Sequence, residues 1–318
     1  ILIFICILYF IYNSCKQRED FKIVIKKKKG AIKSENSVLD GKLILITGAT
    51  GGIGRVLSKK LSSIGCKLII HGRDKYKVDK LESELKKFNP HIIGITADLS
   101  NEDEVDNMIS EITKSYPEIY ALINNAASQT GSKELTSKNF KDWKKDMSVN
   151  IDTTFYLTNK IVNHMRSKSI KGRIINVSGY PSKTTESIYN DGGTILSKSF
   201  IEKFSEILAE ENFDYNIAVT TLRIDEVINT INLDNLENIP IYGKRVKKSV
   251  DKITKYIIPS PSKIIPVFLY ALRAPFHEIS GKLISTNAYL SNPKLSKIVP
   301  SHQINLNDNV YSKKKQYL

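Results

Sequence analysis

A glycine-rich turn that joins a short apolar run to an amphipathic stretch constrains this chain more than any other feature. The apolar run is Leu43 to Ile46, the turn extends from Thr47 to Gly54, and apolar residues at helical spacing follow from Val56 to Ile64. This order is typical of a strand, a tight loop and a helix. The N–H groups at a helix start carry partial positive charge, and glycines before them let a phosphate approach the backbone.

The loop therefore predicts a site for the pyrophosphate of a dinucleotide, with an ordinary tight turn as the alternative. The residues expected there are Gly48, Thr50, Gly51, Gly52, Ile53 and Gly54. A Gly-x-x-x-Gly-x-Gly pattern is common by itself, so its place between a β-rich run and a helix supports the interpretation.

Strand and helix patterns continue to alternate from Gly41 to about residue 290. Apolar runs that predict strands lie at 43–46, 67–71, 91–97, 120–123, 173–177, 217–222 and 282–285. Helical spacing separates them, and its longest stretch covers Phe140 to Met165. This alternation predicts an α/β fold with a doubly wound parallel sheet in one globular domain, 41–290. Ligands of such sheets lie at the carboxyl ends of the strands.

Composition excludes several other classes of protein. The 318 residues are 41% hydrophobic and 25% charged, which is ordinary for a globular body. Cys6, Cys15 and Cys66 have neither metal-binding nor redox spacing, so we expect no metal site and favour a reducing compartment. The net charge of +15 is compatible with nucleic acid or an anionic membrane. We favour a lysine- and asparagine-rich compositional bias and expect no nucleic-acid partner, because no stacking-aromatic or basic-helix module is present.

The two ends of the chain differ from its middle. Residues 1–12 are almost wholly apolar, and a basic linker without apolar periodicity follows at 13–40. We interpret 1–12 as a truncated signal-anchor that attaches the protein to a membrane, with the globular domain facing the cytosol. An organelle-targeting or secretory segment and a buried N-terminal strand are the alternatives. The tail, 291–318, is polar and basic, and we expect it to be solvated.

The residues after the second strand predict which dinucleotide is bound. An acidic residue there would accept a hydrogen bond from the 2′-hydroxyl of NAD, whereas this chain has His71-Gly72-Arg73. The fork of donors on Arg73 suits a 2′-phosphate, and Arg55 offers a second positive group. Asp74 is the counter-evidence, although we expect it to cap the next helix. The sequence therefore favours NADP(H) over NAD(H).

Five short motifs occur in a fixed order along the chain. They are Thr47 to Gly54, Asp98-Leu99, Asn124-Asn125-Ala126-Ala127, Asn150, and Ser197-Lys198. In this order and at these intervals the chain resembles the short-chain dehydrogenase/reductase family from about Gly41 to Thr286. The resemblance implies a seven-stranded Rossmann-type sheet and a nicotinamide cofactor. It also implies that Asp98 contacts adenine, Asn125 and Ala126 lie on the cofactor side, and Lys198 binds the nicotinamide ribose.

The resemblance further implies hydride transfer between nicotinamide and a carbonyl or alcohol. In the family a Ser holds the substrate oxygen and a Tyr exchanges its proton. A Lys four residues later lowers the pKa of that Tyr, and an Asn completes a proton relay. This chain keeps Asn150 and Lys198 but has Thr194 at the Tyr position and Gly179 at the Ser position. Ser178 stands one residue early, which at a strand end turns a side chain to the other face.

The chain departs from the family's pattern at one more place, and it offers two other tyrosines near the predicted reaction site. The family's Pro-Gly after the sixth strand is replaced by Ile224-Asp225, and Tyr180 and Tyr189 are candidates for a relocated proton donor. The candidate catalytic residues are thus Asn150, Ser178, Thr194 and Lys198.

Two functions follow from these observations. The first is an NADP(H)-dependent oxidoreductase with a non-standard active site. The second is a non-catalytic nucleotide-binding protein, a membrane-anchored sensor or interaction partner. The substrate is an unidentified small molecule, and apolar residues such as Ile241, Val267, Phe268 and Leu269 favour a lipophilic one. The family often dimerises through its long helices, so a homodimer is a further expectation.

Overall fold

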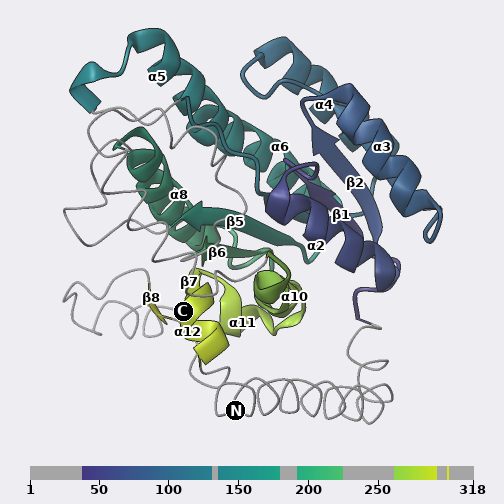
Figure 1. The fold of residues 1–318 in the computed structure, drawn as a ribbon. Helices are drawn as coiled ribbons and strands as arrows, with labels where there is room; N and C mark the ends of the chain where they lie inside the picture. The colour runs from purple at the N-terminus through teal and green to yellow at the C-terminus, as the bar shows by residue number, and fades with distance from the viewer. Residues whose placement is uncertain (1–37, 131–134, 180–191, 225–260, 292–298, 301–318) are drawn as a thin grey trace, which may run out of the picture. The chain divides into compact units, whose positions relative to one another are not determined.

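The computed structural model describes residues 38–130, 135–179, 192–224, 261–291 and 299–300 (Figure 1). Backbone contacts divide the chain into Ile1–Asp40 and Gly41–Leu318, and the fold is that of the second unit. Tyr180, Tyr189, Asp225 and Ile241 lie outside the described residues, as do the predicted membrane segment and almost all of the predicted linker and the predicted tail.

One sheet forms the centre of the domain, and its strand order is β3-β2-β1-β4-β5-β6-β7-β8. The strands are β1 Leu43–Ile46, β2 Lys67–Gly72, β3 Ile92–Thr96, β4 Ile119–Asn124, β5 Arg173–Gly179, β6 Ala218–Ile224, β7 Lys282–Ser285 and β8 Val299–Pro300. All neighbours pair in parallel except β7 and β8, which pair antiparallel. The seven predicted strands and the doubly wound fold are confirmed, and the two-residue β8 is an addition.

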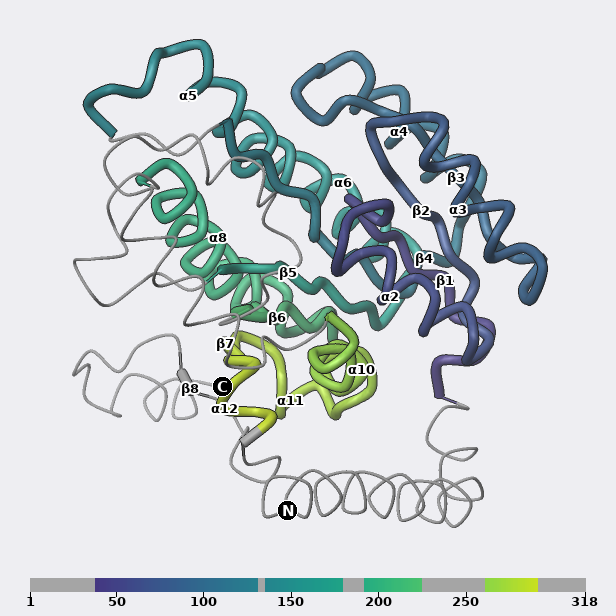
Figure 2. The backbone as a smooth tube through the Cα atoms, in the orientation of Figure 1, coloured from purple at the N-terminus to yellow at the C-terminus, as the bar shows by residue number. Residues whose placement is uncertain are grey.

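Helices cover both faces of this sheet (Figures 1 and 2). They are α2 Gly52–Ser63, α3 Lys75–Lys86, α4 Glu102–Ser115, α5 Phe140–Met147, α6 Thr153–Ser167, α8 Gly192–Glu211, α10 Ile265–Arg273, α11 Phe276–Ile279 and α12 Thr286–Ser291. Short 3₁₀ turns occur at Leu135–Ser137 and Pro261–Ile264. The helices α2, α3 and α10 pack on one face, and α4, α6 and α8 pack on the other.

Apolar periodicity places each helix on the sheet. In α4, Val105, Met108, Ile109 and Ile112 recur at helical spacing and are all buried in the main core beside α6 and α8. Asn101 caps α4 by accepting a hydrogen bond from the N–H of Glu104 at 3.3 Å. All four residues of β1 are buried, as expected of a central strand covered on both faces.

The long helix expected from Phe140 to Met165 is interrupted. A π-helical turn at Ser148–Asp152 separates α5 from α6, and Asn150 lies at its centre. Such turns often occur at functional sites. The periodicity of the apolar residues continues across the interruption, which explains why the sequence predicts one helix.

The strand order reverses direction between β1 and β4. From β1 the chain passes outward through β2 to β3, and it then returns to β4 on the other side of β1. A sheet of this kind leaves a crevice beyond the carboxyl ends of the strands at the reversal. The glycine-rich turn follows β1, and Asn125 follows β4, so both predicted motifs lie at this crevice.

Candidate functional site

The glycine-rich turn is packed too closely for side chains at two positions. Gly48 has a φ of +63°, and a Cβ there would lie 2.9 Å from the Cα of Ala126. A Cβ on Gly54 would lie 2.3 Å from the carbonyl oxygen of Gly48 and 2.8 Å from the Cα of Ala49. Gly51, by contrast, has no contact shorter than 3.4 Å at its Cβ position. Gly48 and Gly54 are therefore structural requirements of the turn.

The start of α2 is available to an anion. Gly51 caps it without a side-chain hydrogen bond, and its first turn holds no acidic residue. Gly51 and Gly52 are exposed, whereas Ile53 and Gly54 are buried. A helix start leaves backbone N–H groups without partners inside the helix, so this turn fits a phosphate group. The predicted pyrophosphate site is thus a chemically suitable cradle.

Residues after β4 hold the turn in place. The backbone N–H groups of Asn125 and Ala126 donate to the hydroxyl oxygen of Thr47 at 3.0 and 3.1 Å. The side-chain amide of Asn125 donates to the carbonyl oxygens of Thr47 and Gly48 at 3.0 and 3.1 Å. Asn125 therefore positions the turn rather than pointing away from it, and Thr47 is a site residue that sequence reasoning did not single out.

His71 ties the turn to the neighbouring strands. Its backbone oxygen accepts from the N–H of Ala49 at 2.8 Å, and its Nδ1 accepts from the N–H of Gly48 at 3.4 Å. Its Nε2 lies 3.0 Å from the carbonyl oxygen of Ala97 at the end of β3. These partners require the neutral ring with its proton on Nε2. Burial lowers the pKa of His71, and this outweighs the contact with Ala97 and the charge of Asp98.

The predicted 2′-phosphate residues differ in their surroundings. Arg73 is exposed just after β2, and the described residues give its guanidinium no ion-pair partner. Arg55 instead pairs with Glu84 of α3, at 2.8 Å between Nη2 and Oε2. Asp74 caps α3 as expected, because its Oδ1 accepts from the N–H of Lys77 at 3.1 Å. Arg73 is therefore the stronger of the two predicted arginines for this role.

Asp98 and Leu99 follow β3 at the same edge of the sheet. The Oδ1 of Asp98 accepts from the N–H and the hydroxyl of Ser100 at 2.9 and 2.8 Å. Burial acts to raise the pKa of Asp98, but these hydrogen bonds and the positive charges of Arg73 and Lys145 outweigh it and hold the pKa low. Asp98 is therefore ionised at neutral pH and can accept further hydrogen bonds.

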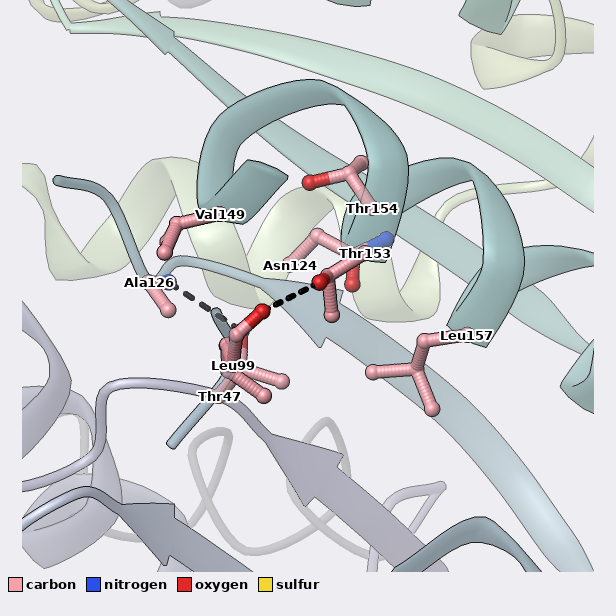
Figure 3. Close-up of a pocket in the computed structure, with 8 residues that line it drawn as sticks. All are labelled: Thr47, Leu99, Asn124, Ala126, Val149, Thr153, Thr154 and Leu157. Carbon is pink, nitrogen blue, oxygen red and sulfur yellow. Dashed lines mark hydrogen bonds between the residues drawn. The ribbon is translucent and has the colours of Figure 1, made fainter. Parts of the chain in front are cut away.

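A small pocket lies between the turn, β4 and the start of α6 (Figure 3). Its lining residues are Thr47, Leu99, Asn124, Ala126, Val149, Thr153, Thr154 and Leu157. The hydroxyl of Thr153 donates to the carbonyl oxygen of Leu99 at 2.5 Å, which joins α6 to the end of β3. Two predicted cofactor residues, Leu99 and Ala126, thus share one pocket.

Asn150 is buried in the π-helical turn and faces the loop after β4. Its side-chain oxygen accepts from the N–H of Ser128 at 2.7 Å, and its amide donates to the carbonyl oxygen of Ser128 at 2.9 Å. The amide also lies 3.3 Å from the hydroxyl oxygen of Ser197 in α8. The structure therefore brings two of the predicted motifs, Asn150 and Ser197-Lys198, together.

Lys198 reaches from α8 to the end of β5. Its Nζ donates to the carbonyl oxygen of Val177 at 2.9 Å. A Cβ built on Gly179 would lie 3.8 Å from Cγ and 3.9 Å from Cε of Lys198, and no other described atom lies within 4 Å. The position that holds the family's Ser therefore faces Lys198 and has room for a side chain.

Ser178 lies elsewhere. Its hydroxyl donates to Oε1 of Glu202 at 2.9 Å, and Glu202 forms an ion pair with Arg223 of β6 at 2.7 Å. The pairing of β5 with β6 continues in register through Gly179, so no bulge moves Ser178 toward the position of Gly179. The structure gives Ser178 a role in joining β5 to α8.

Thr194 stands in the first turn of α8, one turn before Lys198. Its carbonyl oxygen accepts from the hydroxyl of Ser197 at 2.8 Å. A threonine hydroxyl is a far weaker acid than a phenol, and its side chain is shorter. The described residues thus hold the lysine and the asparagine of the family's proton relay but no phenol at its usual place.

A buried charge cluster lies beside this region and was not predicted. The carboxylate of Asp146 accepts from the ammonium of Lys138, the hydroxyl of Ser128, and the N–H and hydroxyl of Thr130. The Lys138 and Asp146 side chains are only 6% and 2% exposed. Asp146 precedes Asn150 by four residues, and this helical spacing is the signal that could have indicated it. Nothing in the sequence distinguishes Lys138 from the other lysines nearby.

The structure also bears on the predictions about substrate polarity, metal binding and membrane spans. Val267 and Phe268 are fully buried and Leu269 nearly so, which means that core packing explains their apolar character and removes their support for a lipophilic substrate. Across the described ranges, no cluster of His, Cys, Asp or Glu is arranged to hold a metal ion. None of the helices in those ranges is both long and apolar enough to cross a membrane.

Comparison with known proteins gives consistent matches. The family model described as short chain dehydrogenase matches residues 42–232. The chain is 29% identical over 240 residues to the NADP-dependent 3-hydroxy acid dehydrogenase of Schizosaccharomyces pombe, covering 74% of this chain and 88% of that protein. It is 26% identical over 254 residues to a 3-oxoacyl-[acyl-carrier-protein] reductase of Aquifex aeolicus, covering 78% and 97% of the two chains.

Solved structures show the same fold. A gluconate 5-dehydrogenase from Burkholderia cenocepacia, in complex with NADP and tartrate, superposes with a TM-score of 0.67 at 20% identity, over 80% of this chain and 96% of that one. A 3-ketoacyl-(acyl-carrier-protein) reductase from Brucella melitensis, complexed with NADH, gives 0.66 at 21% identity, over 78% and 97%.

Proposed function

Because the chain belongs to the short-chain dehydrogenase family of NAD(P)-dependent oxidoreductases, we propose that it binds NADP(H) and interconverts a carbonyl and an alcohol. The observation that carries this proposal is the glycine-rich turn, which Thr47, His71 and Asn125 hold open at the start of α2. A pyrophosphate at this turn would meet backbone N–H groups and the positive end of the helix.

The preference for NADP(H) rests on the end of β2. Arg73 is exposed there, and Asp74 is engaged as the cap of α3. A guanidinium binds phosphate through a fork of charge-assisted hydrogen bonds. The relative from S. pombe is described as NADP-dependent, which supports the same preference. Titration calorimetry on the full chain tests it, because NADP⁺ should bind more tightly than NAD⁺, and comparable affinities would contradict it.

The predicted reaction end of the crevice, which comprises Asn150, Gly179, Thr194 and Lys198, determines how well hydride transfer proceeds. The nicotinamide group supplies or accepts the hydride when bound. We expect Lys198 and Asn150 to lie beside the place where the proton must move. The Nζ of Lys198 donates to the carbonyl oxygen of Val177 in β5, and the side-chain oxygen of Asn150 accepts from the N–H of Ser128. Thr194 offers no phenol at the position of the family's Tyr, and Gly179 offers no hydroxyl at the position of its Ser. General acid catalysis typically contributes about 10²- to 10⁴-fold, so we expect turnover of ordinary carbonyl substrates to be low.

The same observation favours a second candidate function. A site that keeps its cofactor contacts and lacks its proton donor suits a protein that binds NADP(H) without turnover, as a sensor or interaction partner. An assay of NADPH oxidation with a broad panel of carbonyl compounds separates the two candidates. Robust turnover that Tyr180→Phe or Tyr189→Phe abolishes would identify a relocated proton donor and exclude the second candidate.

We also propose that residues 1–12 attach the protein to a membrane with its domain facing the cytosol. The apolar run followed by the lysines at 26–29 supports this placement. Alkaline carbonate extraction of the native protein tests it, since full release into the supernatant would contradict attachment. Glycan addition to an acceptor site engineered in the domain would contradict the orientation and favour the organelle-targeted alternative.

A homodimer through α6 and α8 is a further proposal. Phe155, Leu196 and Ile207 on these helices are 49%, 48% and 53% exposed. Phe155 packs edge-on against Phe204, which stacks on Phe200. An aromatic face of this kind is costly to leave in water. Sedimentation equilibrium tests it, and a monomer at micromolar concentration would contradict it.

A further inference from the structure

Exposed lysines gather along the edge of the sheet that lies opposite the crevice. Strands β1 to β7 are parallel, so their amino ends share this edge. The segments at the starts of β1 to β5 are 40–42, 63–67, 86–91, 113–119 and 167–173, and their acidic residues are Asp40 and Glu118. The exposed lysines of the same segments are Lys42, Lys67, Lys86, Lys87, Lys114, Lys168 and Lys171. We call these lysines, together with Phe88, the amino-edge surface. The turn before β6 is acidic instead and limits this surface, with Glu210, Glu211 and Asp214.

Helix ends explain only some of these lysines. A helix C-terminus favours positive charge, which accounts for the lysines in the last turns or at the C-caps of α3, α4 and α6, namely Lys86, Lys114 and Lys168. Lys42, Lys67 and Lys171 instead stand at the starts of β1, β2 and β5, and strands carry only small dipoles. Leu43 pairs with Lys67, so Lys42 and Lys67 leave from adjacent strands about 5 Å apart. Like charges gathered on one edge repel each other, which favours an anionic partner.

Acidic side chains balance other lysines of the domain but not these. On the surface of α3, for example, Lys75 forms an ion pair with Asp79 at 2.9 Å. Within the ranges that the structure describes, Lys42, Lys67 and Lys171 form no ion pair. Composition alone explains how many lysines the chain has. It does not explain why those at this edge stand apart from acidic side chains.

Phe88 adds an apolar group to the same edge. Its side chain is 83% exposed, the highest value among the large apolar side chains that the structure describes. The buried Asn89 fixes the turn that carries it, because its amide donates to the carbonyl oxygen of Cys66 at 2.8 Å and its side-chain oxygen accepts from the N–H of His91 at 3.0 Å. Cys66 directly precedes Lys67, so the turn holds the phenyl ring close to the lysines. An exposed aromatic ring among lysines is typical of surfaces that enter the headgroup region of a membrane.

The path of the chain indicates which anionic partner this is. Gly41 joins the domain to residues 1–40 and directly precedes Lys42 at the start of β1. Residues 1–12 are almost wholly apolar, and lysines occupy 26–29. A chain attached to a bilayer through 1–12 therefore reaches the domain at the amino-edge surface. Nucleic acid or an acidic protein would match the lysines but not the apolar segment or Phe88.

We propose that the amino-edge surface rests on the anionic face of a membrane, with Phe88 entering the headgroup region. This inference rests on the proposed attachment through residues 1–12 and names the face of the domain that meets the bilayer. It has a consequence for access to the site. The crevice lies at the opposite edge of the sheet and opens to the aqueous phase, so cofactor and substrate reach it from solution.

Quenching by brominated lipid tests which edge touches the bilayer. The full chain has one tryptophan, so Trp143→Phe gives a silent background. Phe88→Trp then places an indole on the amino-edge surface. Tyr76→Trp is the matched control, because Tyr76 is 73% exposed in the first turn of α3, at the other end of a helix about 18 Å long. In brominated phosphatidylcholine vesicles that contain phosphatidylserine, the indole of Phe88→Trp should be quenched several-fold more than that of Tyr76→Trp.

Lysine changes test the charge of the surface. Each lysine near an anionic membrane contributes about fivefold to the contact. In the Phe88→Trp chain, Lys42→Gln, Lys67→Gln and Lys171→Gln together should therefore lower the quenching to that of the Tyr76→Trp control. The same number of changes in α3, at Lys75, Lys77 and Lys80, should leave it unchanged. Omitting phosphatidylserine should have the same effect as removing the three amino-edge lysines.

Salt separates this surface from the anchor. Raising KCl from about 0.15 to about 1 M shortens the screening length from about 8 to about 3 Å, so the quenching should fall while the anchored chain still floats with the vesicles. Failure to float in high salt would contradict attachment through 1–12, and the quenching at low salt would still decide the amino-edge surface. Equal quenching in Phe88→Trp and Tyr76→Trp, no effect of the three amino-edge lysines, or no flotation at either salt would overturn the inference. Binding of single-stranded RNA that depends on those lysines, without quenching by vesicles, would also overturn it and assign the surface to nucleic acid.

Discussion

The two ends of the crevice differ in how much of the family's arrangement they keep. At the cofactor end, Thr47, His71 and Asn125 hold the glycine-rich turn through backbone and side-chain hydrogen bonds. At the predicted reaction end, the chain keeps Asn150 and Lys198 but has Gly179 and Thr194 where the family has a Ser and a Tyr. We infer that the contacts that hold the glycine-rich turn can stay while the groups that exchange the proton change, with Lys198 as the residue expected to serve both cofactor and proton.

A single methyl group added at Gly54 should disrupt cofactor binding. In Gly54→Ala the new Cβ would lie 2.3 Å from the carbonyl oxygen of Gly48, so the turn must move. Losing two charge-assisted hydrogen bonds to phosphate, worth about 1.5–3 kcal/mol each, should lower NADP⁺ affinity by more than about a hundredfold. Calorimetric titration measures this. Gly179→Ala is the matched control, because a Cβ there would have no contact shorter than 3.8 Å and Gly179 lies outside the turn. An equal loss in that variant would show that the packing argument is mistaken.

The rate of carbonyl reduction should rise when the family's Ser and Tyr are restored. Gly179 has room for a side chain facing Lys198, and Thr194 stands one helical turn before it. Gly179→Ser together with Thr194→Tyr should raise NADPH-dependent carbonyl reduction by about 10²- to 10⁴-fold, because a general acid is regained. Steady-state assays with the same carbonyl panel measure the change. No gain in a folded, NADP⁺-binding double variant would mean that the backbone there departs from the family.

Cofactor choice should depend on one arginine. Arg73→Ala should weaken NADP⁺ by about 1.5–3 kcal/mol, or about 10- to 150-fold, and leave NAD⁺ nearly unchanged. Arg55→Ala is the control, because Arg55 already pairs with Glu84 and should change the ratio of affinities little. If Arg55→Ala and Arg73→Ala alter the ratio equally, Arg73 alone does not select the phosphate.

The smallest predicted effect is the pH dependence of folding stability that comes from His71, whose ring accepts a hydrogen bond from the turn. The unfolded chain takes up the proton of His71 at the ordinary pKa of 6.5, whereas burial lowers that pKa in the folded protein. Between these values the unfolded state binds more protons, so stability is complete above about pH 6.5 and falls as the pH drops below it. The loss should approach about 1.4 kcal/mol per pH unit within that window.

Thermal unfolding as a function of pH tests this effect. The fall below pH 6.5 should disappear in His71→Gln and persist in His91→Gln, because His91 precedes β3 whereas the turn follows the carboxyl end of β1 in the same parallel sheet. A parallel fall in both variants would assign the pH dependence to other groups, such as Asp98, whose charge acts on the pKa of His71.

The fold was more predictable from the sequence than the site. Buried strands such as β1 are continuous apolar runs, so their positions and parallel pairing follow from composition and order. The π-helical turn at Asn150 escaped prediction because apolar spacing continues across it. The two-residue β8 gives no recognisable pattern.

Side-chain partners were the least predictable part. Arg55 was expected at the cofactor and pairs with Glu84, and Ser178 turns to Glu202. Both outcomes depend on residues far away in the chain, which a local pattern does not reveal. The cluster of Lys138 and Asp146 is of the same kind, because its partners come from a loop and two helical segments that only the fold brings together.

We propose that this chain keeps its cofactor site and has lost efficient proton transfer. The direct measurement is a fluorescence titration of NADPH with the full chain, followed in the same sample by addition of the carbonyl panel. We expect saturable binding and then a signal that persists, since hydride transfer is slow without the phenol. Absence of saturable binding, or rapid loss of the NADPH signal when a carbonyl is added, would contradict this proposal.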